Sequence, residues 1–136
     1  MATRQDLIIE QGADWSFVWT KRNAAGAAVN LTGYTARAKV KDGVNGVSQA
    51  YLSTGADAYG GSIALGGAAG TVTMAMSAAQ SGALASDIST VSVVLSVEDL
   101  AKPVKTYIYD LELISPAGVV TRELQGRVVV RREITT

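Results

Sequence analysis

Residues 104–114 read VKTYIYDLELI, and residues 119–131 read VVTRELQGRVVVR. In the first stretch large apolar side chains occupy every second position, the period of a β-strand with one buried face. The tetrapeptide SPAG separates the two stretches, and its proline and glycine favour a tight chain reversal. The two stretches are therefore predicted to form a long β-hairpin, with Gly126 as a break in its second strand.

The same alternation recurs along the chain, whereas helical periodicity is almost absent. The predicted strands are residues 6–10, 14–21, 34–41, 62–65, 71–76, 90–97, 104–114 and 119–131, with weaker pairing of residues 48–52. The predicted inward side chains of three of them are Tyr34, Ala36, Ala38, Val40, Val72, Met74, Met76, Tyr107, Tyr109, Leu111 and Leu113. One short helix is expected over residues 77–86, with Ser77 as its N-cap.

This spacing of short strands indicates an all-β fold, an antiparallel Ig-like β-sandwich of about seven to eight strands. A chain of 136 residues is expected to form one domain, residues 1–136. The terminal segments, residues 1–6 and 131–136, are expected to serve as short arms that add to the sheet edge of a neighbouring subunit. Gly33 is expected to turn the chain into the strand over residues 34–41.

The composition limits the chemistry that this chain can perform. Twelve Lys and Arg residues balance twelve Asp and Glu residues, which disfavours a nucleic-acid binder or a membrane-surface protein. The chain has no cysteine and no histidine, so thiolate sites are excluded and the commonest general base is missing. No apolar run approaches the length of a membrane helix, and the N-terminus lacks the pattern of a secretory signal. We expect a non-enzymatic protein with no cofactor and no metal.

Two clusters of polar or small residues could carry chemistry. Asp110 and Glu112 share one strand face and could bind Ca²⁺ or act as an acid–base pair, but a solvated face opposite Arg122, Arg127 or Lys105 is the favoured interpretation. Residues 66–70, GGAAG, lack the lysine and the following helix of a phosphate-binding loop, which favours a plain turn.

Two further patterns could mark binding surfaces. Trp15, Phe17 and Trp19 form an aromatic stripe that could bind carbohydrate, although a core role is favoured because large side chains are scarce. The arginines near the C-terminus could contact nucleic acid, but Glu123 and Glu133 lie among them and no aromatic residues are interleaved. Protection of an edge strand or a salt bridge to another subunit is therefore the favoured role of these arginines.

Three segments occur in an order that carries a family resemblance: QDLIIEQG at residues 5–12, NLTGYTAR at residues 30–37 and YDLELISPAGVVTR at residues 109–122. Together they resemble a family of small tailed-bacteriophage virion proteins, β-sandwich modules associated with long tail fibres and baseplates. They are also similar to the N-terminal domain of phage baseplate upper proteins. The residues that match this pattern are Gly12, Leu31, Gly33, Tyr34, Asp110 and Gly118, and the resemblance implies that they are architectural.

The resemblance implies a structural role in a virion that is assembled in the host cytoplasm. We expect a tail, baseplate or tail-fibre-anchoring adaptor that forms a symmetric homo-oligomer and contacts other phage virion proteins, without nucleic acid or membrane as a partner. A capsid decoration protein that cements neighbouring capsomers, or a carbohydrate-binding module, remains the alternative. The predicted interface comprises the N-terminal arm, the loop at residues 53–61 and the last arginines. Its candidate residues are Arg4, Asp6, Asp57, Tyr59, Arg127, Arg131 and Arg132.

Overall fold

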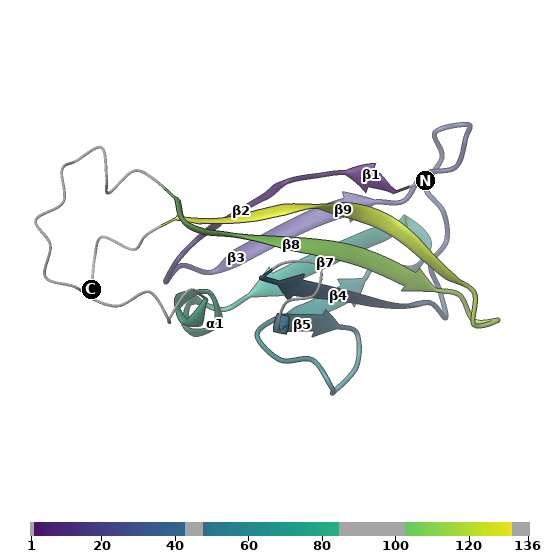
Figure 1. The fold of residues 1–136 in the computed structure, drawn as a ribbon. Helices are drawn as coiled ribbons and strands as arrows, with labels where there is room; N and C mark the ends of the chain where they lie inside the picture. Colours follow the sequence, from purple (N-terminus) through teal and green to yellow (C-terminus); the bar gives the residue numbers. More distant parts are fainter. Residues whose placement is uncertain (1, 43–47, 85–102, 132–136) are drawn as a thin grey trace, which may run out of the picture.

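The computed structural model describes residues 2–42, 48–84 and 103–131, and these form two β-sheets that share one hydrophobic core (Figure 1). The all-β class predicted from the sequence is confirmed. The strands are β1 (Thr3–Arg4), β2 (Leu7–Glu10), β3 (Trp15–Thr20), β4 (Thr35–Lys41), β5 (Ser48–Ser53), β6 (Ser62–Leu65), β7 (Thr71–Met76), β8 (Pro103–Ile114) and β9 (Val120–Arg131). A 3-10 turn spans Gly67–Ala69, and the helix α1 spans Ala78–Ala83. The strand predicted over residues 90–97 lies outside the described residues.

The larger sheet has the order β1-β9-β8-β4-β5, with β2 also paired to β9, and the smaller sheet has the order β3-β7-β6. The predicted hairpin is present: β8 and β9 form a long antiparallel ribbon, drawn in green and yellow in Figure 1. Residues 48–52 were expected to pair only weakly. In the structure they belong to strand β5, which pairs with β4. Its apolar side chains Ala50 and Leu52 are buried, and this burial fixes the pairing of β5 with β4.

Alternation sets the core, as the sequence indicates. Side chains at every second position of β4, β7 and β8 point between the sheets, where they form a single buried cluster with residues of β2, β5, β6 and β9. The predicted inward residues that are buried are Ala36, Ala38, Val40, Val72, Met74, Met76, Tyr107, Tyr109, Leu111 and Leu113. Tyr34 is half-buried and packs against the cluster.

The aromatic stripe of β3 also faces this cluster. Trp15, Phe17 and Trp19 are half-buried and pack against the core, while Val18 between them is 58% exposed. β3 is the first strand of the smaller sheet and pairs with β7 along its whole length. Its aromatic rings therefore cover the core at that side of the sandwich. The core role predicted for the stripe is confirmed.

The predicted helix and its cap are present. The Ser77 hydroxyl accepts a hydrogen bond from the Gln80 backbone N–H at 3.2 Å, and the Gln80 side chain accepts one from the Ser77 N–H at 2.9 Å. This reciprocal capping box satisfies two backbone donors that would otherwise lack partners. No helix within the described ranges is long and apolar enough to cross a bilayer.

The N-terminal segment differs from its prediction as a free arm. β1 and β2 both pair with β9 of the same chain, in the parallel direction. The physical reason is that β9 would otherwise present a row of unpaired backbone donors and acceptors at the sheet edge. Residues 3–10 are therefore part of the sandwich, and its sheets are antiparallel except at this edge.

The expected break at Gly126 is also wrong, since β9 runs without interruption from Val120 to Arg131. The glycine instead allows a close approach by the N-terminal segment. A Cβ at this position would lie 2.4 Å from the Gln5 carbonyl oxygen, which also accepts a hydrogen bond from the Tyr109 hydroxyl at 2.5 Å. Gly126 thus permits the N-terminal strands to lie against β9.

Candidate functional site

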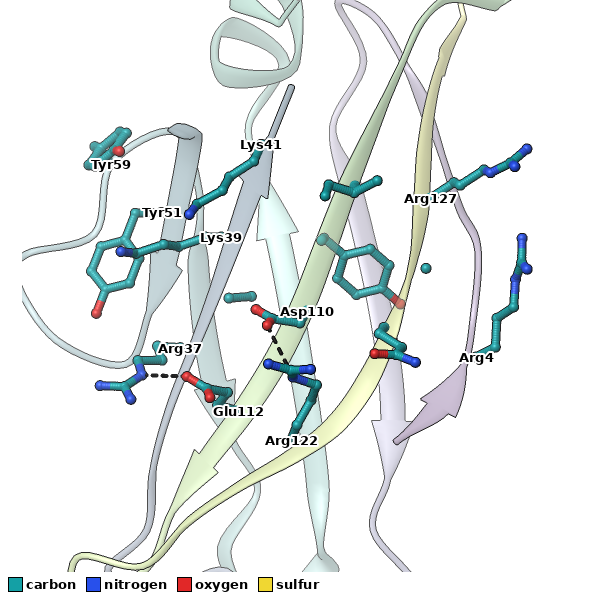
Figure 2. A pocket seen from close by; sticks show the side chains of 15 residues that line it. Arg4, Arg37, Lys39, Lys41, Tyr51, Tyr59, Asp110, Glu112, Arg122 and Arg127 are labelled. Carbon is teal, nitrogen blue, oxygen red and sulfur yellow. Dashed lines mark hydrogen bonds and ion pairs between the residues drawn. The ribbon is translucent and has the colours of Figure 1, made fainter. Parts of the chain in front are cut away.

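The outer face of the larger sheet carries an open depression of about 1070 Å³ (Figure 2). It extends across β5, β4, β8 and β9 to Arg4 of β1. Its residues come from all parts of the chain and are brought together by strand pairing. The lining residues are Arg4, Arg37, Ala38, Lys39, Lys41, Tyr51, Tyr59, Ile108, Tyr109, Asp110, Glu112, Arg122, Gln125, Gly126 and Arg127.

Strand register arranges the outward side chains of this face in rows, because directly paired residues on neighbouring strands point to the same side. Each row crosses from β4 through β8 to β9, about 5 Å per step. The three rows are Arg37–Glu112–Arg122, Lys39–Asp110–Gln125 and Lys41–Ile108–Arg127. The middle row continues to Tyr51 on β5 at one end and to Arg4 on β1 at the other.

Both carboxylates of the face are engaged by arginine. Arg37 Nε lies 2.9 Å from a Glu112 oxygen, and Arg122 Nε lies 3.2 Å from an Asp110 oxygen. Figure 2 marks both contacts with dashed lines. The favoured prediction, a solvated face with Arg122 opposite these carboxylates, agrees with this geometry. Among the described residues no group of three metal-ligating side chains is present.

The face carries more positive than negative charge. Six Lys and Arg side chains line it against two carboxylates, a formal excess of four positive charges in a chain whose total is zero. Within the described ranges no carboxylate lies within ion-pair distance of Lys39, Lys41 or Arg127. Lys39 Nζ instead lies 5.7 Å from the centre of the Tyr51 ring, a cation–π geometry. In Figure 2 the labelled cations surround Asp110 on several sides.

Two tyrosines form one side of the depression. The backbones of Tyr51 and Tyr59 exchange two hydrogen bonds, and their ring centres are 6.1 Å apart with a 50° tilt. Tyr59 is half exposed, and the loop that carries it is held by Asp57, which accepts a hydrogen bond from the Ser53 hydroxyl at 2.8 Å. That hydrogen bond is the main reason why the pKa of Asp57 lies below its usual value.

Three of the predicted interface residues lie on this face: Arg4, Tyr59 and Arg127. Asp6 has an internal role instead. Its carboxylate accepts a hydrogen bond from the Arg127 backbone N–H at 3.0 Å, which lowers the pKa of Asp6, and the Arg4 guanidinium lies 3.5 Å away. Asp6 therefore fastens the N-terminal segment to β9.

The two remaining arginines of the predicted interface lie elsewhere. Arg131 is the last residue of β9 and its guanidinium lies 3.8 Å from Glu10 on β2, outside the depression. Arg132 lies outside the described residues. The turn at Gly67–Ala69 ends at Gly70 in the left-handed conformation and accepts a backbone hydrogen bond from Leu31, as the plain-turn interpretation of residues 66–70 predicts.

Four residues of this face were not predicted from the sequence as site residues: Arg37, Lys39, Lys41 and Tyr51. The signal was available, because alternation had already placed three cations on the outward face of residues 34–41. The sequence does not show which strands lie beside residues 34–41. Those neighbouring strands decide whether a carboxylate lies next to each cation. No protein-family model matches the sequence, and no curated protein matches it. The phage resemblance therefore rests on the three sequence segments, and the function is argued from the face itself.

Proposed function

We propose that this protein is a non-enzymatic structural protein of a tailed-phage virion, a tail, baseplate or fibre-anchoring adaptor that acts through the outer face of its larger sheet. The observation that carries the proposal is the composition of that face. Arginine and tyrosine side chains surround two carboxylates that are themselves paired with arginine, and arginine and tyrosine are enriched in protein–protein interfaces. The partners are other virion proteins, with the chain itself in a symmetric homo-oligomer.

Two observations support this proposal. The segments that resemble the phage family lie mainly in β2, at the entrance to β4 and in the β8–β9 hairpin, all within the sheet that carries the face. Trp15 and Trp19 pack against the core, which weakens the carbohydrate-binding alternative that depended on their rings.

The test is to locate the protein in purified virions of the phage that encodes it. Tails and heads are separated, and each fraction is probed with an antibody to this chain, with a known tail protein and a known head protein as controls. We expect the protein in the tail fraction. Recovery only with heads would favour the decoration-protein alternative, and absence from intact particles would contradict both.

A further inference from the structure

We propose that the row Lys41–Ile108–Arg127 binds an extended acidic protein segment in which two carboxylates flank an apolar side chain. The proposal rests on the proposed function for the identity of the partner as another virion protein. The binding chemistry itself is argued from this face alone.

The row differs from its neighbours in having cations without a carboxylate between them. Ile108 is the register partner of both Lys41 and Arg127. Two strand spacings separate the two cationic residues, so their Cα atoms lie about 10 Å apart. In the row Arg37–Glu112–Arg122 a carboxylate occupies the central place, whereas here it is a half-buried isoleucine. Along this row a positive side chain, an apolar side chain and a second positive side chain therefore follow one another.

The nearby carboxylates are already committed. Asp110 on the adjacent row is paired with Arg122, and Asp6 accepts the backbone N–H of Arg127 while it contacts Arg4. Figure 2 shows the Lys41 and Arg127 side chains extending away from each other, toward opposite sides of the depression. Within the part of the chain that the structure describes, neither Lys41 nor Arg127 forms an ion pair, so carboxylates brought by a partner can pair with both.

The chemistry of the face favours a polypeptide over a nucleic acid. Asp110 and Glu112 lie in the middle of the face, where a nucleic acid, charged at every phosphate, places negative charge against them. An extended polypeptide instead presents backbone N–H groups there, which can donate to these carboxylates and to the Gln125 side-chain oxygen. In an extended segment residues i, i+2 and i+4 point to the same side over about 13 Å. A segment of the form acidic–x–apolar–x–acidic matches a row whose cationic side chains spread outward.

The test is a titration of the full-length, ¹⁵N-labelled protein, followed by NMR amide shifts. The probe is a blocked peptide, Thr-Glu-Thr-Val-Thr-Glu-Thr, compared with the same peptide carrying Gln for Glu and with an eight-nucleotide oligothymidylate. We expect the acidic peptide to shift the amides around Lys41, Ile108 and Arg127, and the Gln peptide to leave them in place. Binding should weaken as salt rises, because these charges are exposed to screening.

Charge-reversal variants then locate the site. Lys41→Glu and Arg127→Glu should each weaken peptide binding by about fivefold or more, whereas Arg22→Glu, the same charge change at an exposed turn outside the face, should stay within about twofold. Equal binding of the Gln peptide, tighter binding of oligothymidylate, or no effect of either face variant would overturn the proposal. The titration does not depend on where the protein resides, so absence from virions contradicts the proposed function and not the site.

Discussion

Gly33 adopts a φ of +83° in the turn that leads into β4, as the sequence predicts. The left-handed region strains any residue with a Cβ, and a β-branched residue most of all. A Cβ here would also lie 3.0 Å from Pro116 in the β8–β9 turn. Gly33→Val should therefore lower the free energy of unfolding by about 1–3 kcal/mol. Chemical denaturation followed by circular dichroism measures this loss.

Gly26 provides the matched control for Gly33. It has nearly the same φ, +84°, but a Cβ there would meet nothing within 4 Å. Gly26→Val introduces the same backbone strain but no close contact like the one between position 33 and Pro116. It should therefore destabilise the protein less than Gly33→Val. An unchanged melting temperature of Gly33→Val would show that the turn relaxes at no cost.

The Asp6 carboxylate should make the attachment of the N-terminal segment to β9 depend on pH. Its pKa is lowered in the folded state from the usual 3.8, chiefly because the Arg127 backbone N–H donates to the carboxylate. A lowered folded pKa means that the stabilisation is complete above the unfolded pKa and is lost as the pH falls through the folded one. The Arg127 amide shift should therefore titrate with a midpoint below 3.8. The Asp6→Asn variant should abolish that titration, and a midpoint above this value in the unaltered chain would contradict the prediction.

At the scale of elements, one buried hydroxyl joins α1 to the turn between β2 and β3. Ser81 Oγ donates to the Ala13 carbonyl at 2.6 Å and accepts from the Gly12 N–H at 3.1 Å. Ser81→Ala removes both hydrogen bonds of this buried hydroxyl, so it should lower the free energy of unfolding by about 1–3 kcal/mol. Equilibrium unfolding in urea measures the loss.

The control for Ser81 is Ser16→Ala, because Ser16 is an exposed serine on β3. We expect that variant to change stability by no more than about 0.5 kcal/mol. Equal effects of the two substitutions would show that the Ser81 contacts contribute nothing to the attachment of the helix.

Elements were predicted well where the signal is local. Alternation, the SPAG turn and the Ser77 cap act over a few residues, and each appears where expected. The errors concern Gly126 and the N-terminal arm, where a distant partner decides. Gly126 does not interrupt β9, because its missing side chain accommodates the Gln5 carbonyl, about 120 residues earlier in sequence.

At the scale of the whole molecule, the two sheets depend on one shared core. Leu111 of β8 is fully buried and belongs to the cluster to which both sheets contribute. Leu111→Ala should lower the free energy of unfolding by about 2–5 kcal/mol, because the cavity it leaves cannot fully collapse. The denaturation midpoint measures this loss.

Val18→Ala serves as the control, since Val18 is 58% exposed on the outer side of β3. This substitution should lower the free energy of unfolding by about 1 kcal/mol or less, because the Val18 side chain buries little apolar surface when the protein folds. A Leu111→Ala loss as small as that of Val18→Ala would contradict the single-core description.

The sequence by itself determined most of the described strands, their buried faces, the SPAG turn and the Ser77 cap, because these follow from side-chain period and turn chemistry within a few residues. It also placed Arg37, Lys39 and Lys41 on an outward face. Only the tertiary structure decided that β1 and β2 complete the edge of β9, and that cations of β4 and β9 gather around β8. Strand neighbours and register depend on backbone hydrogen bonds between distant segments. A formally neutral composition therefore does not reveal a positively charged face.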